Sequence, residues 1–302
     1  MGHSSFMQFC QAAMLLPPAL REEVETLPEE WKERAEEIRL RAGHPTALVF
    51  PEEEREVGKH PVSPADLELV LEIATRGSVH SAMEQVRNGF FTVPGGHRIG
   101  ICGSGVCRSG EVWNLRQISS LAIRVARQVS GVSGTVLDRL WQDGELQSTW
   151  IISPPGWGKT TLLRDLIRAV SDGEGHPPRR VGVADERGEL AGMYGGQPQF
   201  QLGRQTDVLD GCPKGVGLLM LLRGMNPQVL ALDEITAPED VAALEMAANC
   251  GVALLATAHA RTRAELEARP LYRRLLEQKL FRRLVLIDRG TQERRYQVVE
   301  LC

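Results

Sequence analysis

The residues best suited to chemistry in this sequence form a short loop with two glycines, a lysine and two threonines. The loop runs Ser153-Pro154-Pro155-Gly156-Trp157-Gly158-Lys159-Thr160-Thr161. Glycines let backbone N–H groups approach a phosphate chain without a Cβ clash, and a helix beginning here adds the positive end of its dipole. The lysine reaches the β- and γ-phosphates, and the hydroxyl of Thr160 binds Mg²⁺. The loop therefore predicts a binding site for ATP and Mg²⁺.

This loop departs from the strict pattern Gly-x-x-x-x-Gly-Lys-Ser/Thr at one position, where Ser153 replaces the first glycine. Serine fits that position provided that its φ is negative. The surrounding pattern supports the prediction, because residues 150–152 read as a buried strand and residues 160–170 as a helix. A surface turn of the same composition is the alternative explanation.

An acidic site is predicted beside the phosphate loop, where Asp233-Glu234 follows the apolar run 229–232. A carboxylate at the carboxyl end of a strand, beside a phosphate loop, can hold Mg²⁺ through water, and a second one can polarise the attacking water. We assign Asp233 to the metal and Glu234 to the base. The alternative is a solvated acidic turn that leads into a helix.

Two further strand ends carry candidate residues. Asp185-Glu186-Arg187 ends the run 181–184, and His259 follows the run 252–257. The acidic group would position water or the metal, and a neutral His259 would sense the γ-phosphate as a donor. A salt-bridged surface loop and a structural histidine are the alternatives for these two places.

The first half of the chain predicts a small α+β domain. Residues 19–42 carry glutamates around spaced apolar side chains, which is typical of an exposed amphipathic helix or a helix pair divided near Pro28. A further helix is expected over 64–75, strands at 47–50, 90–93, 98–102 and 121–125, and a hairpin turn at 94–97. Residues 131–149 predict a helix and linker, so the domains are expected to be 1–135 and 136–302.

The second half alternates strands with helices. Besides the elements around the phosphate loop, strands are expected at 181–184, 229–232 and 252–257, and helices at 214–223 and 238–249. The strands are almost continuously apolar, which indicates a parallel sheet covered by helices on both faces. The final segments 284–288 and 294–301 predict an antiparallel hairpin.

The overall composition narrows the functional classes. The chain has 302 residues, a net charge of -4 and 5% aromatic residues, which disfavours a polybasic nucleic-acid binder with stacking platforms. No segment of the sequence reaches the run of about 20 apolar residues that is needed to span a bilayer. The six cysteines include no Cys-x-x-Cys pair, so we expect free thiols in a reducing cytosol rather than a zinc site.

Several segments resemble the stage III sporulation protein AA ATPases of spore-forming bacteria, which are relatives of the type II and type IV secretion and pilus ATPases. Besides the phosphate loop, these are residues 38–43, Gly95-Gly96-His97-Arg98-Ile99-Gly100-Ile101-Cys102-Gly103, 118–121, 185–187, Arg204-Gln205-Thr206-Asp207-Val208-Leu209-Asp210, 212–214, Arg223-Gly224-Met225-Asn226-Pro227, 233–235 and 257–259. They extend from about Glu37 to Asp288. Gly188 departs from the family, which more often has serine there.

The resemblance implies a RecA-like P-loop NTPase domain behind a smaller N-terminal α+β domain, and a ring-shaped homo-oligomer, expected to be a hexamer. It also implies a role in the mother cell during endospore formation, energising a secretion-like channel with the membrane proteins of the stage III sporulation complex. The expected location is the cytoplasm, with recruitment to the inner membrane through partners. In the secretion relatives an acidic box and a histidine box lie close to the nucleotide, and the resemblance assigns these to Glu186 and His259.

The sequence thus predicts a motor ATPase in which Lys159, Mg²⁺ and loop amides neutralise the phosphates while Glu234 orients water. An arginine from a neighbouring subunit or the N-terminal domain is expected to complete the site, with Arg124, Arg204 and Arg223 as candidates. A nucleotide-gated scaffold that hardly hydrolyses ATP is the alternative from another class. A RecA-like nucleic-acid motor is a third hypothesis, disfavoured by the negative net charge.

Overall fold

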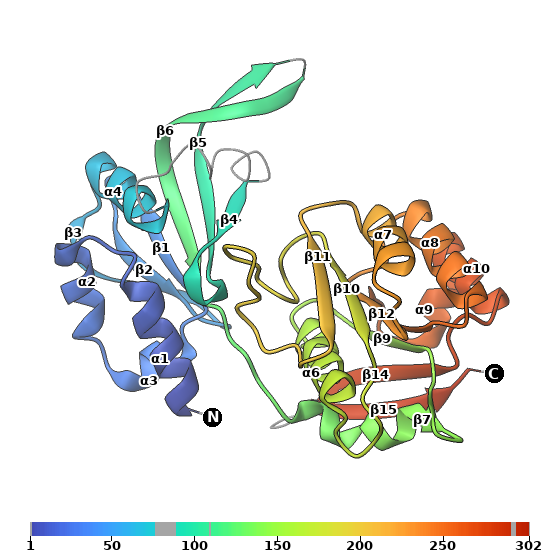
Figure 1. Cartoon of the computed structure of the whole chain (residues 1–302). Coiled ribbons are helices and arrows are strands. Elements are labelled where there is room, and N and C mark those ends of the chain that lie inside the picture. Colours follow the sequence, from blue (N-terminus) through green and yellow to red (C-terminus); the bar gives the residue numbers. More distant parts are fainter. Residues whose placement is uncertain (1, 76–88, 109, 291–293, 302) are drawn as a thin grey trace. The chain divides into compact units, whose positions relative to one another are not determined.

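The computed structural model describes residues 2–75, 89–108, 110–290 and 294–301. Residues 1–127 with 194–199 form one compact unit, called unit 1, and residues 128–193 with 200–302 form unit 2. Hydrophobic core clusters lie within each unit, one in unit 1 and two in unit 2 among the described residues. Figure 1 labels the helices and strands of both units. The domain boundary predicted after residue 135 stays a prediction. None of the helices in the described ranges combines the length and the apolar character that a membrane span needs.

Unit 1 is an antiparallel sheet covered on one face by helices. The sheet has the strand order β3-β2-β1-β6-β5-β4. Its strands are β1 (Glu37–Arg41), β2 (Pro45–Val49), β3 (Glu54–Pro61), β4 (Phe90–Thr92), β5 (Arg98–Arg108) and β6 (Glu111–Arg124), and its helices are α1 (Gly2–Ala13), α2 (Pro18–Glu25), α3 (Glu29–Arg34), α4 (Pro64–Thr75) and the 3₁₀ turn η1 (Pro94–Gly96). Apolar side chains of α1, α2 and α4 pack against alternate residues of the strands, such as Ile38 and Ile123. The period of two along each strand leaves polar side chains for the other face.

Unit 2 is built on a seven-stranded sheet of order β11-β10-β12-β13-β9-β14-β15, parallel except for β15. Its strands are β7 (Trp141–Gln142), β8 (Glu145–Leu146), β9 (Thr149–Ser153), β10 (Val181–Asp185), β11 (Thr206–Asp210), β12 (Val229–Leu232), β13 (Ala253–His259), β14 (Arg283–Arg289) and β15 (Arg294–Glu300), with β7 and β8 as a separate hairpin. Its helices are the 3₁₀ turns η2 (Val132–Thr135) and η3 (Leu137–Leu140), and α6 (Lys159–Asp172), α7 (Lys214–Gly224), α8 (Pro238–Asn249), α9 (Arg263–Ala268) and α10 (Pro270–Glu277).

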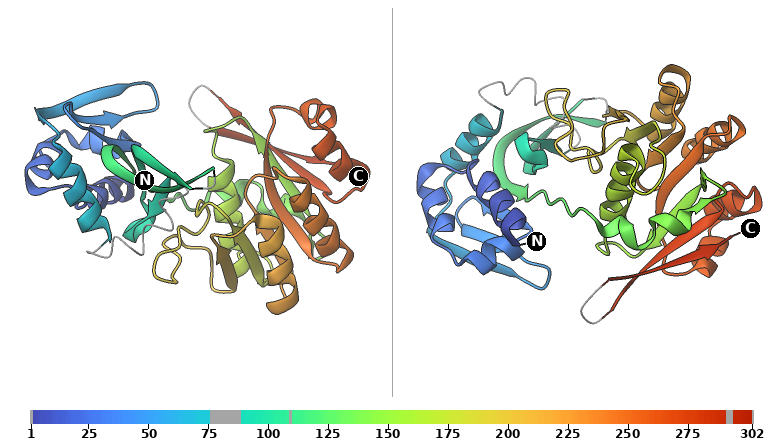
Figure 2. Two further views of the ribbon diagram at one scale, coloured as in Figure 1. Left: turned by 90° about the horizontal axis from the view of Figure 1, so that it is seen from above. Right: turned by 60° about the horizontal axis from the view of Figure 1, so that its bottom comes forward.

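Helices cover both faces of this sheet, as the apolar strands predicted. One core joins the sheet to α6 through side chains such as Leu162 and Leu166. The other core joins it to α7, α8 and α10 through side chains such as Leu218, Leu244 and Leu275. The two views of Figure 2 show α6 apart from α7, α8 and α10, with the sheet between them. This layering fixes the strand ends rigidly, which matters for the side chains that follow them.

Two predictions about local structure were wrong. The helical reading of residues 19–42 holds for α2 and α3, but Glu37–Arg41 is strand β1, because its polar and apolar residues alternate with period two. The helix expected within 131–149 is absent: this stretch forms η2, η3 and the small β7–β8 hairpin. Asp143 and Gly144 have positive φ of 52° and 78°, so this Asp-Gly pair makes a two-residue hairpin turn rather than ending a helix.

Candidate nucleotide site

Loops that follow parallel strands gather at one edge of the unit 2 sheet. Since β12, β13 and β9 are adjacent and parallel, their carboxyl ends lie side by side. His259, the last residue of β13, pairs in register with Ser153, the last residue of β9. The strand order therefore brings the phosphate loop and the Asp233-Glu234 turn, which are distant in sequence, to one place, the edge at which open parallel sheets bind ligands.

The phosphate loop has the backbone that its glycines indicate. Gly156 and Gly158 have φ of 75° and 97°, values that disfavour any residue with a Cβ. Ser153 is not among the residues of positive φ, so serine fits where the strict pattern has glycine. A Cβ on Gly158 would also come within 2.9 Å of Nη1 of Arg294, but this is the end of a flexible side chain that can move aside, so the positive φ is the stronger reason for glycine.

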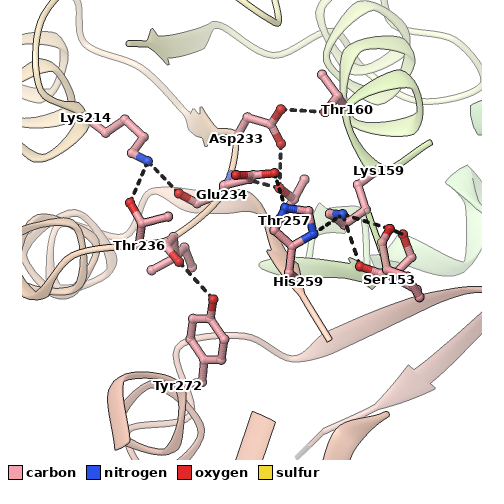
Figure 3. Close-up of polar contacts among 12 residues, drawn as sticks. Ser153, Lys159, Thr160, Lys214, Asp233, Glu234, Thr236, Thr257, His259 and Tyr272 are labelled. Atoms are coloured by element: carbon pink, nitrogen blue, oxygen red, sulfur yellow. Dashed lines mark hydrogen bonds and ion pairs between the residues drawn. The ribbon is translucent and has the colours of Figure 1, made fainter. Parts of the chain in front are cut away.

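Lys159 is buried at the start of α6, and its ammonium group faces the loop. Nζ donates to the carbonyl oxygens of Ser153 at 3.1 Å and Pro154 at 3.3 Å, and lies 2.8 Å from Nδ1 of His259 (Figure 3). Burial lowers the pKa of Lys159, against the opposing effect of Glu234 and Asp233. A phosphate oxygen carries more charge than a carbonyl oxygen, so it is the stronger partner for this ammonium group.

The side-chain oxygens of Asp233 and Thr160, which could both act as metal ligands, lie next to each other. The Thr160 hydroxyl donates to Oδ2 of Asp233 at 2.6 Å, and the Thr257 hydroxyl donates to Oδ1 at 2.5 Å. Burial raises the pKa of Asp233, partly offset by these two hydrogen bonds. Hard oxygen donors of this kind suit Mg²⁺, and a cation here would favour the charged carboxylate that burial disfavours. The pair fits the predicted metal ligands; among the described residues, no group of three or more His, Cys, Asp or Glu side chains forms a metal site by itself.

Glu234 has an unusual backbone and a defined side-chain partner. Its φ is 55°, a left-handed conformation that costs roughly 1–3 kcal/mol in a residue other than glycine. Its Oε1 lies 2.5 Å from Nε2 of His259. Since Nδ1 of the same ring faces the ammonium group of Lys159, the partners assign the proton to Nε2. His259 therefore links the predicted phosphate-binding lysine to the predicted base.

The other acidic turn, after β10, is arranged differently. The Asp185 carboxylate accepts three backbone N–H groups, those of Glu189, Leu190 and Ala191, so it organises its own turn. Burial raises the pKa of Asp185, while these hydrogen bonds lower it. Glu186 is half-exposed and lies 3.7 Å from Nζ of Lys214. Both residues border a small hollow that Asp233 and Glu234 also line, so Glu186 lies beside the site and its catalytic role stays a prediction.

Two of the three candidate arginines belong to unit 2 and lie away from this edge of its sheet, and the third belongs to unit 1. Arg204 precedes β11 and pairs with Asp172 at the end of α6, and Arg223 lies in the last turn of α7, so both belong to the amino-terminal edge of the strands. Arg124 belongs to unit 1, where it pairs with Glu37. A hollow of about 730 Å³ also opens at the amino-terminal edge, around residues such as Gln228, but it contains none of the phosphate-loop residues.

Sequence reasoning missed three side chains at this site. Thr257 contacts Asp233 and accepts the N–H of Glu234 at 2.8 Å. Lys214 donates to the Glu234 carbonyl oxygen, and Arg294 lies against Gly158. Thr257 and Lys214 fall within segments that carried the resemblance, but their residue types alone gave no role. Arg294 begins β15, opposite Arg289 in the final hairpin, and only the position of this hairpin beside β9 brings it to the loop.

Comparison with solved structures identifies the fold. The chain is similar to the pilus retraction motor PilT with bound ADP, with a TM-score of 0.62 and 15% identity over 93% of this chain and 81% of that chain. It is also similar to the Legionella pneumophila ATPase DotB, with a TM-score of 0.58 and 16% identity over 87% of this chain and 76% of that chain. The architecture is thus the predicted one, a RecA-like P-loop NTPase domain with a smaller N-terminal α+β domain.

Sequence comparison identifies the family. The Bacillus subtilis protein named Stage III sporulation protein AA is 38% identical over 281 residues, which cover 93% of this chain and 91% of that protein. The family model described as "Sporulation stage III, protein AA" matches residues 11–299, almost the whole chain. The chain therefore belongs to the sporulation stage III protein AA family, the family whose segments its sequence resembles.

Proposed function

We propose that this protein binds ATP with Mg²⁺ and hydrolyses it as the motor ATPase of a secretion-like channel complex in endospore formation. The observation that carries the proposal is the convergence of Lys159, Thr160, Asp233 and Glu234 at one edge of a parallel sheet. Membership of the sporulation family supports the cellular role. The shared fold with PilT, whose structure holds ADP, supports nucleotide binding.

In the proposed mechanism, the loop amides and the amino terminus of α6 hold the phosphates, and Lys159 moves from the carbonyls of Ser153 and Pro154 to the β/γ oxygens. Thr160, and Asp233 through water, would hold Mg²⁺, and the ion would supply positive charge beside the phosphates. Glu234 orients the attacking water and accepts its proton. Catalysis here consists of positioning and charge neutralisation, which the observed contacts are suited to supply.

His259 supports this mechanism by coupling two of its parts. Its ring joins Nζ of Lys159 to Oε1 of Glu234. When Lys159 turns to a phosphate, Nδ1 loses that partner, whereas Nε2–H still holds the Glu234 carboxylate. His259 is therefore proposed to keep the base aligned while the lysine responds to the nucleotide.

The assembled form is proposed to be a ring-shaped homo-oligomer, expected to be a hexamer, located in the mother-cell cytoplasm and recruited to the inner membrane by partner proteins of the sporulation complex. Arg124, Arg204 and Arg223 belong to unit 1 or to the amino-terminal edge of the unit 2 sheet. Arg204 or Arg223 would thus serve the site of a neighbouring subunit, and Arg124 is the candidate from the N-terminal domain. Turnover is then expected to rise faster than linearly with protein concentration.

The direct test measures Mg-ATP binding by calorimetry, turnover, and molar mass in solution with and without Mg-ATP. Lys159→Ala is expected to weaken nucleotide binding roughly 10- to 100-fold, since it removes a charge-assisted hydrogen bond worth about 1.5–3 kcal/mol. Exposed Lys59→Met serves as the matched control and is expected to bind like the parent. A parent protein that releases no heat with Mg-ATP contradicts the proposal.

The substitution Glu234→Gln distinguishes a motor ATPase from a nucleotide-gated scaffold, because it retains the phosphate loop and removes the proposed base. A motor is expected to lose its function in sporulating cells although the variant still binds ATP. A nucleotide-gated scaffold would keep its function with the same substitution. Spore counts and ATP affinity for parent and variant, measured together, decide between the two.

A further inference from the structure

A buried lysine outside the phosphate loop contacts the Asp233-Glu234 turn. Lys214 is the first residue of α7, and its side chain is 6% exposed. Its Nζ donates to the carbonyl oxygen of Glu234 at 2.6 Å and to Oγ1 of Thr236 at 3.1 Å (Figure 3). A buried ammonium group needs such partners, because leaving it without them costs its full desolvation penalty.

The directional contacts of Lys214 go to the turn and not to the neighbouring carboxylates. Oε2 of Glu186 lies 3.7 Å from Nζ, and Oδ2 of Asp240 lies 3.8 Å from it, both beyond hydrogen-bond distance. Oδ2 of Asp240 already accepts the N–H groups of Thr236 and Ala237 at the start of α8. Lys214 is therefore oriented by the Glu234 carbonyl, with the carboxylates as compensating charge.

The main-chain N–H and C=O groups of Glu234 each form a hydrogen bond with a buried side chain. The Thr257 hydroxyl accepts its N–H at 2.8 Å, and Lys214 binds its C=O. The next residue is held as well, because the N–H of Ile235 donates to the Thr257 carbonyl and its C=O accepts from the Tyr272 hydroxyl. A non-glycine residue with φ of 55° persists only where its surroundings over-determine it, and these contacts do so.

We infer that Lys214 is a positioning residue that holds Glu234 in its left-handed conformation and so aims the carboxylate at the attacking water. The inference rests on the role proposed for Glu234 above. Lys214 acts on the main chain of that residue, so its loss affects the orientation of the base and leaves the phosphate loop intact. The lysine also ties the base to α7, which begins at the same residue.

The main test combines Lys214→Met with Glu234→Gln in a double-mutant cycle. Lys214→Met is expected to lower kcat about 10- to 100-fold, the cost of a misplaced group, while ATP affinity stays within about threefold. In the Glu234→Gln background the same change is expected to cost less than about threefold, since the base is already absent. Equal losses in the two backgrounds, or a loss of affinity as large as that of kcat, would overturn the inference.

A second measurement does not depend on turnover. Hydrogen exchange at the amides of Glu234 and Ile235 is expected to be at least about tenfold faster in Lys214→Met, with β12 unchanged. Unchanged exchange at these amides contradicts the inference even if the parent hydrolyses ATP, and faster exchange supports it even if the parent binds no nucleotide. If the methionine variant does not fold, Lys214→Gln replaces it in both measurements, and Lys59→Met is the control for loss of a lysine charge.

Discussion

Unit 2 contains the dipeptide Asp-Glu at the ends of two adjacent parallel strands, and the two copies have different surroundings. At the end of β10, Asp185 binds the amides of the turn that follows it, and Glu186 is half-exposed. After β12, Asp233 faces the Thr160 and Thr257 hydroxyls, and Glu234 reaches His259. The same residues at equivalent places thus have different partners. We therefore expect the turn after β10 to act mainly in the structure and the turn after β12 mainly in the proposed chemistry.

The largest expected difference between the turns lies in turnover. Glu234→Gln is expected to lower kcat on the order of 10²- to 10⁴-fold, the usual contribution of a general base, with ATP affinity retained. Glu186→Gln, the matched change in the other turn, is expected to lower kcat less than about tenfold, because the ion partner of its carboxylate among the described residues is Lys214, at 3.7 Å. Steady-state ATPase assays on both variants give the answer. Comparable losses would remove the distinction between the turns.

Thr257 provides a further test of the difference between the turns, because its hydroxyl bonds to both Asp233 and Glu234. Thr257→Val keeps the shape but removes the contacts to Asp233 and to the Glu234 amide, so kcat is expected to fall roughly 10- to 100-fold through misalignment. Thr149→Val on β9 is a matched control, since that buried hydroxyl donates to the Gln147 carbonyl, away from the phosphate loop. If the two valine variants turn over ATP alike, the proposed alignment by Thr257 is wrong.

Asp185 is expected to affect stability and not nucleotide affinity. Asp185→Asn replaces one of two oxygens that accept the amides of Glu189, Leu190 and Ala191, which leaves at least one buried N–H without an acceptor. The free energy of unfolding is expected to fall by about 1–3 kcal/mol. Denaturant titration measures this loss, and calorimetry should find ATP affinity unchanged. An unaltered stability with weakened ATP binding would reverse the assignment.

The smallest effect concerns pH. Burial raises the pKa of Asp233 above its ordinary value of 3.8. The folded state then holds the proton of Asp233 more tightly than the unfolded state does. The contribution of this group to the free energy of unfolding is therefore fully present below pH 3.8 and is lost as the pH rises through the folded pKa. Asp233→Asn removes this ionisation, and the free energy of unfolding of the variant relative to the parent is expected to rise with pH, by about 1.4 kcal/mol for each unit of pKa shift. A difference that stays flat between pH 4 and 7 would contradict this.

Local pattern predicted much of the molecule. The loop 153–161, helix α6 and the alternating strands and helices of unit 2 all depend on short-range preferences and on apolar runs, which a sequence displays directly. The two errors also have local reasons. The alternation of Glu37–Arg41 is hidden within a longer glutamate-rich stretch, and Asp143-Gly144 makes a hairpin turn within the stretch 131–149 that was expected to be a helix and linker.

By itself the sequence determined that a phosphate loop and two acidic strand ends exist, because glycine spacing and strand boundaries are local properties. Only the tertiary structure decided which acidic pair faces the loop and which side chains hold it. That choice depends on the order β12-β13-β9, which places His259 and Thr257 between Asp233 and Lys159. Strand order follows from how helices pack across the sheet, and the partners of a buried charge are set by that packing at distances of a few ångströms, which no local pattern encodes.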